Sequence, residues 1–195
     1  MSKRNLLLNP YWSAKDLGQA IPDSPHAVSV ALPRWEDVIA YEEKEPSTIQ
    51  SLRAIYPRFG LNPLVFEVSE YARKKFNLDA FNAWPYPNFK TAQKAKNHCQ
   101  KSESKGETTI CEVLGLHCLF TDSISTPSAK AFWQHTGLGA SSRLAEIALN
   151  RKKAPLATDA NKARDILLQR LSNIYYCPTK NISLHPSGMA ALTSA

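Results

Sequence analysis

The chain has 195 residues and a mass of 21.7 kDa, which suits one large domain or two small ones. Apolar residues make up 43% of it and charged residues 21%, a balance that excludes a wholly disordered chain, a coiled coil and a collagen-like repeat. No apolar run approaches the roughly 18 residues of a membrane-spanning helix, and the leucines at 6–8 are too few for a secretory signal. We therefore expect a soluble, cytoplasmic protein with no membrane partner.

The net charge is +7, from 24 Lys and Arg against 17 Asp and Glu, and the isoelectric point is near 9.3. This charge suits an anionic partner, either a nucleic acid or a phosphorylated small molecule. The basic residues are scattered, with the densest groups at 73–75 and 151–153, and no RNA-binding or zinc-finger pattern accompanies them. We interpret them as solvated helix faces and expect no nucleic-acid partner; a basic nucleic-acid-binding module is the weaker alternative.

The four cysteines, at 99, 111, 118 and 177, form no C-x-x-C pair, so the common zinc spacing is absent. Cys111 and Cys118 lie in an apolar run, where a free thiol packs as a small hydrophobic group. The alternative is a metal gathered by these thiols with His98 and His117. We predict no metal site.

The first half of the chain predicts short elements. Residues 1–26 carry prolines at 10, 22 and 25 and are expected to form an extended arm. The alternation over 27–32 predicts a strand that Pro33 ends, and 35–41 predicts a short helix. Pro63 begins a helix whose apolar residues keep a 3–4 spacing as far as Phe76.

The middle of the chain mixes helices and strands. The proline-rich residues 82–87 are expected to form a loop, and Asn88 caps a helix with Ala92, Ala95 and Cys99 on one face. Residues 101–107 form a turn, and the β-branched, apolar residues 108–120 predict one strand. A helix follows from Thr126-Pro127, and Ser141 or Ser142 caps the next.

The last part predicts a helix from Thr158 or Asp159, a strand over 181–184, a turn, and the start of a helix over 190–195. The buried stripe expected on the long helix is Ala163, Ile166, Leu167, Arg170, Leu171 and Ile174. The alternation of strands and helices indicates an α/β or α+β fold. A single parallel strand needs neighbours, so we expect an interrupted domain whose residues from about 156 onward lack packing partners.

A glycine turn that opens a helix brings backbone N–H groups towards a ligand, which suits a phosphate. Here that turn reads Ser187-Gly188-Met189-Ala190-Ala191, and it resembles the Ser-Gly-Met-Ala-Ala/Ser segment of the pyridoxal-phosphate enzymes of cysteine and methionine metabolism. Three other blocks, at 27–43, at 56–59 and at 129–143 (Ala-Lys-Ala-Phe-Trp-Gln-His-Thr-Gly-Leu-Gly-Ala-Ser-Ser-Arg), resemble the N-terminal extension of fungal-type cystathionine γ-synthases in the same order.

This resemblance implies an organisation and an activity. It implies an arm over 1–26, an α+β extension over 27–150, and over 151–195 the beginning of the large domain of a type I pyridoxal-phosphate transferase, with an incomplete parallel sheet. The implied activity is γ-replacement on an activated homoserine ester by cysteine, in trans-sulfuration and methionine biosynthesis. The implied partners are small amino-acid substrates and further copies of the chain in a homo-oligomer.

The resemblance also implies the cofactor site. Gly188 and Met189 match backbone donors to the phosphate of pyridoxal 5′-phosphate, and Ser187 lies in the same loop. Arg143 is the candidate for a phosphate clamp across a subunit boundary, although Ser141 stands where the family has Tyr. A second Tyr-x-Arg sequence begins at Tyr56, but it lies much farther before Gly188 than the family's motif does, so it ranks lower.

In that family the lysine that bonds the cofactor, the aspartate on the pyridine nitrogen and the ring-stacking aromatic all follow the Ser-Gly-Met loop. We therefore expect an N-terminal fragment without the catalytic lysine and without activity alone, and we assign no catalytic residue. Structural packing or a hydrogen bond to the loop is the favoured role for His135, over that of a general base. The alternative is a non-catalytic interaction or regulatory protein from a degenerated gene.

Overall fold

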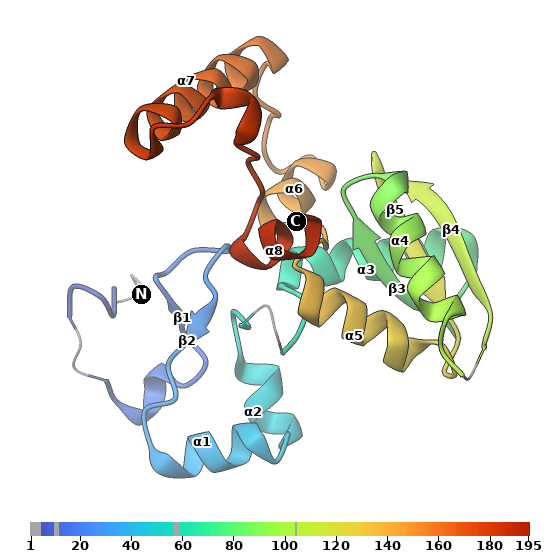
Figure 1. Cartoon of the computed structure of the whole chain (residues 1–195). Helices are drawn as coiled ribbons and strands as arrows, with labels where there is room; N and C mark the ends of the chain where they lie inside the picture. Colours follow the sequence, from blue (N-terminus) through green and yellow to red (C-terminus); the bar gives the residue numbers. More distant parts are fainter. Residues whose placement is uncertain (1–4, 10–11, 57–58, 104) are drawn as a thin grey trace.

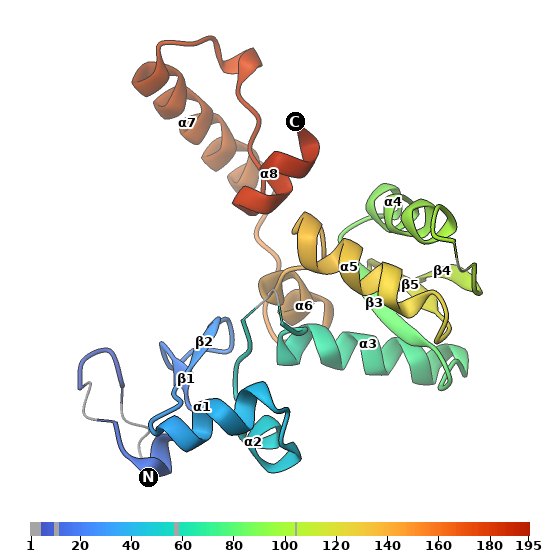
Figure 2. The ribbon, with the colours of Figure 1, turned by 60° about the horizontal axis from the view of Figure 1, so that its bottom comes forward.

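The computed structural model describes residues 5–9, 12–56, 59–103 and 105–195. It is a mixed α and β structure with two small antiparallel sheets, so the expectation of a mixed fold is confirmed. A central unit carries the larger sheet, an N-terminal lobe lies beside it, and one long helix projects away from both (Figures 1 and 2). Among the described residues, no helix is long and apolar enough to cross a membrane.

The central sheet has the strand order β3-β5-β4, and both pairings are antiparallel. Its strands are β3 (Asn82–Tyr86), β4 (Thr108–Val113) and β5 (Leu116–Thr121). The strand expected over 108–120 is thus a hairpin, because Leu114 and Gly115 both have positive φ and form its two-residue turn. The prediction of one strand was wrong because Leu114 stands where Asn or Asp usually marks such a turn.

Both faces of this sheet are covered by helices. On one face lie α3 (Pro63–Phe76) and α6 (Ser142–Ala148), whose buried residues join Cys118 and Phe120 of the sheet in one core. On the other face lie α4 (Phe89–Gln100) and α5 (Thr126–Thr136). Because β3 and β5 are buried on both sides, hydrophobic alternation is weak along these two strands.

The four predicted helices of the central unit, α3, α4, α5 and α6, are confirmed. Asn62 caps α3 by accepting from the N–H of Leu64, with Pro63 at the first helical position. Asn88 caps α4 in the same way. The predicted inner face of α4, Ala92, Ala95 and Cys99, is fully buried.

Residues 82–87, expected to form a loop, contain strand β3 instead. Pro85 is tolerated because β3 lies at the edge of the sheet. The carbonyl of Pro85 accepts from the N–H of Ala140 at 2.9 Å, on the side away from β5. In a strand the N and O of one residue point to the same side, so the missing N–H of Pro85 removes no bond to β5.

The N-terminal lobe is built from short elements around a small core of Ala20, Ala27 and Ala54. It contains the turn η1 (Ala14–Asp16), the paired strands β1 (Ala20–Ile21) and β2 (Ser29–Val30), and the helices α1 (Trp35–Glu42) and α2 (Pro46–Ser51). The predicted helix at 35–41 is confirmed, and the strand predicted over 27–32 is reduced to two residues.

The C-terminal part departs most from expectation. The long helix α7 (Ala157–Tyr175) has no buried residue, and its Ile166, Leu167 and Ile174 are 46%, 50% and 64% exposed, so the predicted buried stripe was wrong. Residues 181–184 form no strand: the turn η2 (Thr179–Asn181) runs into extended backbone that pairs with no described strand. No parallel strand pair is present among the described residues, because the only apolar stretch expected to supply one has no neighbour.

The final helix α8 (Gly188–Ser194) is confirmed, and it returns to pack on α5. Its Ala190 is fully buried, and the hydroxyl of Thr193 donates to the carbonyl of Thr136 at 3.3 Å. This contact places the Ser187-Gly188-Met189 turn against the C-terminal end of α5 (Figure 2).

Candidate functional site

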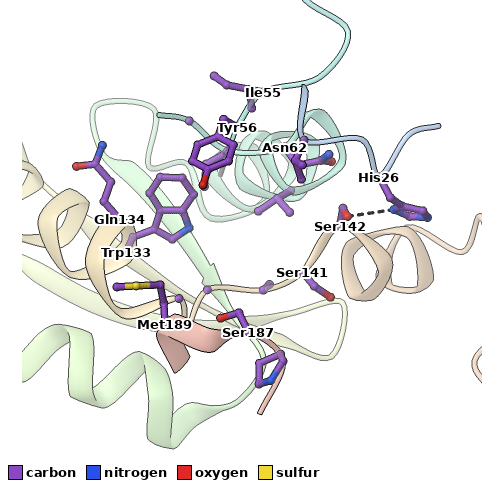
Figure 3. Close-up of a pocket in the computed structure, with 18 of the residues that line it drawn as sticks. His26, Ile55, Tyr56, Asn62, Trp133, Gln134, Ser141, Ser142, Ser187 and Met189 are labelled. Atoms are coloured by element: carbon purple, nitrogen blue, oxygen red, sulfur yellow. Dashed lines mark hydrogen bonds between the residues drawn. The ribbon is translucent and has the colours of Figure 1, made fainter. Parts of the chain in front are cut away.

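A pocket of about 560 Å³ lies where α8, the end of α5, the start of α3 and the N-terminal lobe meet (Figure 3). Its volume is within the range of small-ligand sites. Its lining is mostly apolar, with a few hydroxyl, amide and imidazole groups, and it consists of His26, Val28, Ile55, Tyr56, Gly60, Leu61, Asn62, Val65, Trp133, Gln134, His135, Gly137, Gly139, Ala140, Ser141, Ser142, Pro186, Ser187 and Met189.

The four sequence blocks that carry the family resemblance all contribute to this pocket. Val28 comes from the first block, Tyr56 from the second, Trp133 to Ser142 from the third, and Ser187 with Met189 from the fourth. These blocks are separated by up to about 160 residues, so only the tertiary structure brings them together.

The N-terminal lobe is tied to the pocket through His26, which sequence reasoning missed because no motif surrounds it. The Nδ1 of His26 is 3.0 Å from Oγ of Ser142, and its Nε2 is 3.3 Å from Oε2 of Glu146. The side-chain amide of Asn62 donates to the carbonyl of Pro25 at 2.9 Å. Together these contacts hold the lobe against α3 and α6.

The Ser187-Gly188-Met189 turn is fixed by its own cap and by close packing. Oγ of Ser187 accepts from the N–H of Ala190 at 3.2 Å, which starts α8. Gly137, at the end of α5 with φ of +63°, touches the turn so closely that a Cβ there would lie 2.6 Å from Oγ of Ser187. The turn therefore depends on glycine at position 137.

The turn fits a phosphate group. Gly188 and Met189 are the first residues of α8, so their N–H groups have no carbonyl one turn earlier to bond. Gly188 is exposed, and a Cβ built on it meets no atom within 4 Å, so the approach is open. Among the described lining residues there is no lysine, so nothing lining the pocket matches the residue that bonds the cofactor in the family.

The structure separates the two candidates for a phosphate clamp. Arg143 is exposed on α6 and is not among the residues that line the pocket in the described part of the chain. Tyr56, which the sequence ranked lower, does line it, while Pro57 and Arg58 lie outside the described residues. His135, for which packing or a hydrogen bond to the loop was favoured, is exposed and lines the pocket.

Comparisons with known proteins agree with the sequence blocks. The cystathionine γ-synthase of Saccharomyces cerevisiae is 31% identical over 157 residues, which cover 70% of this chain and 24% of the yeast protein. That of Neurospora crassa is 29% identical over 164 residues, 68% of this chain and 25% of its own length. The chain resembles the N-terminal portion of fungal cystathionine γ-synthases.

A bacterial relative extends the similarity. The L-2-amino-4-chloropent-4-enoate dechlorinase/desaturase of Streptantibioticus cattleyicolor is 26% identical over 183 residues, 90% of this chain and 36% of its own length. No family model matches the chain, and no solved structure does. The chain spans about a quarter of the length of the fungal cystathionine γ-synthases that it matches.

Proposed function

We propose that this chain supplies the N-terminal part of a cystathionine γ-synthase-like enzyme, which carries out γ-replacement on an activated homoserine ester by cysteine in trans-sulfuration. The observation that carries the proposal is the meeting of all four family-like blocks at one pocket. Blocks kept for folding alone have no need to converge on a cavity, whereas blocks that hold a ligand do.

The proposed cofactor is pyridoxal 5′-phosphate, the cofactor of cystathionine γ-synthases. When bound, it supplies an electron sink for the amino-acid substrate. The N–H groups of Gly188 and Met189 would donate to its phosphate, and the hydroxyl of Ser187, which accepts from Ala190, has its hydrogen left to donate. Arg143 would reach the phosphate of a neighbouring subunit in a homo-oligomer, because its exposed position on α6 leaves it accessible to a second chain.

A second candidate is a non-catalytic interaction or regulatory protein. It is favoured by the absence of lysine from the described lining of the pocket. Under this reading the pocket binds the phosphorylated ligand without converting it. The chain alone is then expected to form no cystathionine from an activated homoserine ester and cysteine.

The phosphate site is tested with pyridoxine 5′-phosphate, which has no aldehyde and so binds without a lysine bond. Gly188→Pro removes one N–H donor at the first helical position, where the fixed φ of proline fits. Ser187 before it is already extended, with φ of −154° and ψ of 161°, as the residue before a proline requires. Gly188→Ala is the matched control, because it keeps the donor and enters open space.

Isothermal titration should show affinity for pyridoxine 5′-phosphate about 10- to 100-fold weaker in Gly188→Pro, since a hydrogen bond to a charged group is worth about 1.5–3 kcal/mol. Gly188→Ala should bind like the unmodified chain. Equal affinities in all three proteins would exclude the turn as the phosphate site. Turnover of the homoserine ester by the chain alone would exclude the non-catalytic reading.

A further inference from the structure

Two aromatic side chains from distant parts of the sequence line the pocket. Tyr56 comes from the segment before α3 and is 52% exposed, and Trp133 comes from α5. In Figure 3 the Tyr56 ring lies on one side of the Trp133 indole, and Met189 lies on the other. Met189 is also 45% exposed, so apolar surface remains uncovered at this point of the pocket.

Each of these rings is held by further aromatic contacts. The Tyr56 ring lies 5.7 Å from that of Phe59, which lies 6.4 Å from that of Tyr41. The indole of Trp133 is 6.2 Å from that of Trp84. Gly139 packs so closely on Trp133 that a Cβ added to this glycine would lie 2.6 Å from the indole Nε1. Rings positioned in advance lose little conformational entropy when a ligand binds.

The polar groups of the pocket restrict the chemistry of its ligand. Its described lining contains no Lys, Arg, Asp or Glu, so binding there rests on apolar contacts and hydrogen bonds rather than on ion pairs with those side chains. Oγ of Ser141 and Oγ of Ser187 each accept from a helix N–H, which leaves their hydroxyl hydrogens to donate. A flat ring with acceptor substituents satisfies both the aromatic walls and these donors.

We propose that Tyr56 and Trp133 bind the ring of a planar heteroaromatic ligand, so that the N-terminal lobe contributes directly to the site. The inference rests on the proposed function in one respect: the ring and the phosphate held by the Ser187-Gly188-Met189 turn belong to the same molecule. The family resemblance places the ring-stacking aromatic after Met189, so the assignment of these two residues is additional to it.

The test uses one probe for each part of the ligand. Pyridoxine, which has no phosphate, tests the ring, and inorganic phosphate tests the Ser187-Gly188-Met189 turn. Tyr56→Leu removes one aromatic wall of the pocket. Because Tyr56 is exposed, this substitution should leave the packing of the core unchanged. Tyr56→Phe keeps the ring, and Tyr71→Leu, at a 45% exposed tyrosine of α3 outside the pocket lining, is the control. Saturation-transfer NMR on the pyridoxine ring protons gives the affinity.

We expect Tyr56→Leu to weaken pyridoxine binding about tenfold, equivalent to about 1.4 kcal/mol, with inorganic phosphate binding unchanged. Tyr56→Phe and Tyr71→Leu should bind like the unmodified chain. Unchanged pyridoxine binding in Tyr56→Leu overturns the ring assignment and leaves the phosphate turn standing. Conversely, a Gly188→Pro protein with unchanged phosphate binding overturns the phosphate turn while the ring assignment stands. If the unmodified chain binds neither probe, both are overturned.

Discussion

Replacement of Gly137 by alanine should detach α8 from the central unit. Gly137 ends α5 with φ of +63°, a conformation that an L side chain rarely adopts. A Cβ there would lie 2.6 Å from Oγ of Ser187, 2.8 Å from Cβ of Met189 and 3.1 Å from the backbone N of Ala190. Two of these atoms cannot rotate away, so α8 itself must move.

The size of the effect follows from what holds α8. The left-handed conformation costs an alanine about 1–2 kcal/mol. Among its residues α8 buries only Ala190, and exposing one methyl group costs about 0.8 kcal/mol. Moving α8 away is therefore cheaper than compressing the contact, and the combined loss should be roughly 2–3 kcal/mol.

The matched control is Gly115→Ala, in the turn between β4 and β5. Gly115 has φ of +73°, and a Cβ built there meets no atom within 4 Å. This variant therefore carries the backbone strain without the contact with α8. Any difference between the two proteins measures the docking of α8.

Hydrogen exchange followed by mass spectrometry measures directly whether α8 stays docked. In Gly137→Ala the amides of α8 should exchange at the rate of an unfolded segment, while those of α3 and α4 stay protected; in Gly115→Ala the protection of α8 should be kept. Pyridoxine 5′-phosphate binding should fall only in Gly137→Ala, because Ser187 and Met189 leave the pocket. Equal protection of α8 in both variants would show that the contact at Gly137 does not hold the helix.

Two further predictions concern Arg143 and Cys118. In an oligomeric preparation, Arg143→Ala should weaken pyridoxine 5′-phosphate binding about 10- to 100-fold and leave the melting temperature of the monomer unchanged; equal affinity by titration would remove Arg143 from the site. Burial raises the pKa of Cys118 to about 12, above its value in the unfolded chain, so the stability it contributes is fully present below about pH 8.5 and is lost as the pH rises towards about 12. In that window Cys118 accounts for a loss of at most about 1.4 kcal/mol of unfolding free energy per pH unit, so the fall measured by urea unfolding should be less steep in Cys118→Ala; identical slopes would contradict a raised pKa at Cys118.

Elements with local signals were predictable from the sequence. Asn62-Pro63 and Asn88 each combine a capping side chain with the apolar spacing of a helix, and α3 and α4 begin at these residues. Ser187 likewise caps α8. In each case the residues that decide the structure lie within one helical turn of one another, so the neighbouring sequence suffices.

Elements that depend on distant partners were not predictable in the same way. Strand β3 contains Pro85, which excludes a central strand but not an edge strand, and the edge position is set by β5, more than 30 residues later. The apolar spacing of α7 resembles that of a buried helix, yet the helix has no buried residue, and Ile166, Leu167 and Ile174 are about half exposed or more. Periodicity reports which face a helix would bury, and a partner decides whether it does.

The candidate site shows the same division between local and distant information. The Ser187-Gly188-Met189 turn could be found from its own residues, because a glycine at a helix start is a local feature. The position of Tyr56 in the pocket could not, since its distance along the sequence from Gly188 argued against a shared site. The fold removes that objection by returning α8 to α5 and by fixing the N-terminal lobe through His26, so that Tyr56 and Ser187 line one pocket. Position in the sequence therefore ranks candidates poorly wherever a lobe folds back: within one chain Tyr56 lines the pocket and Arg143 does not, and the role of Arg143 across a subunit boundary stays a prediction.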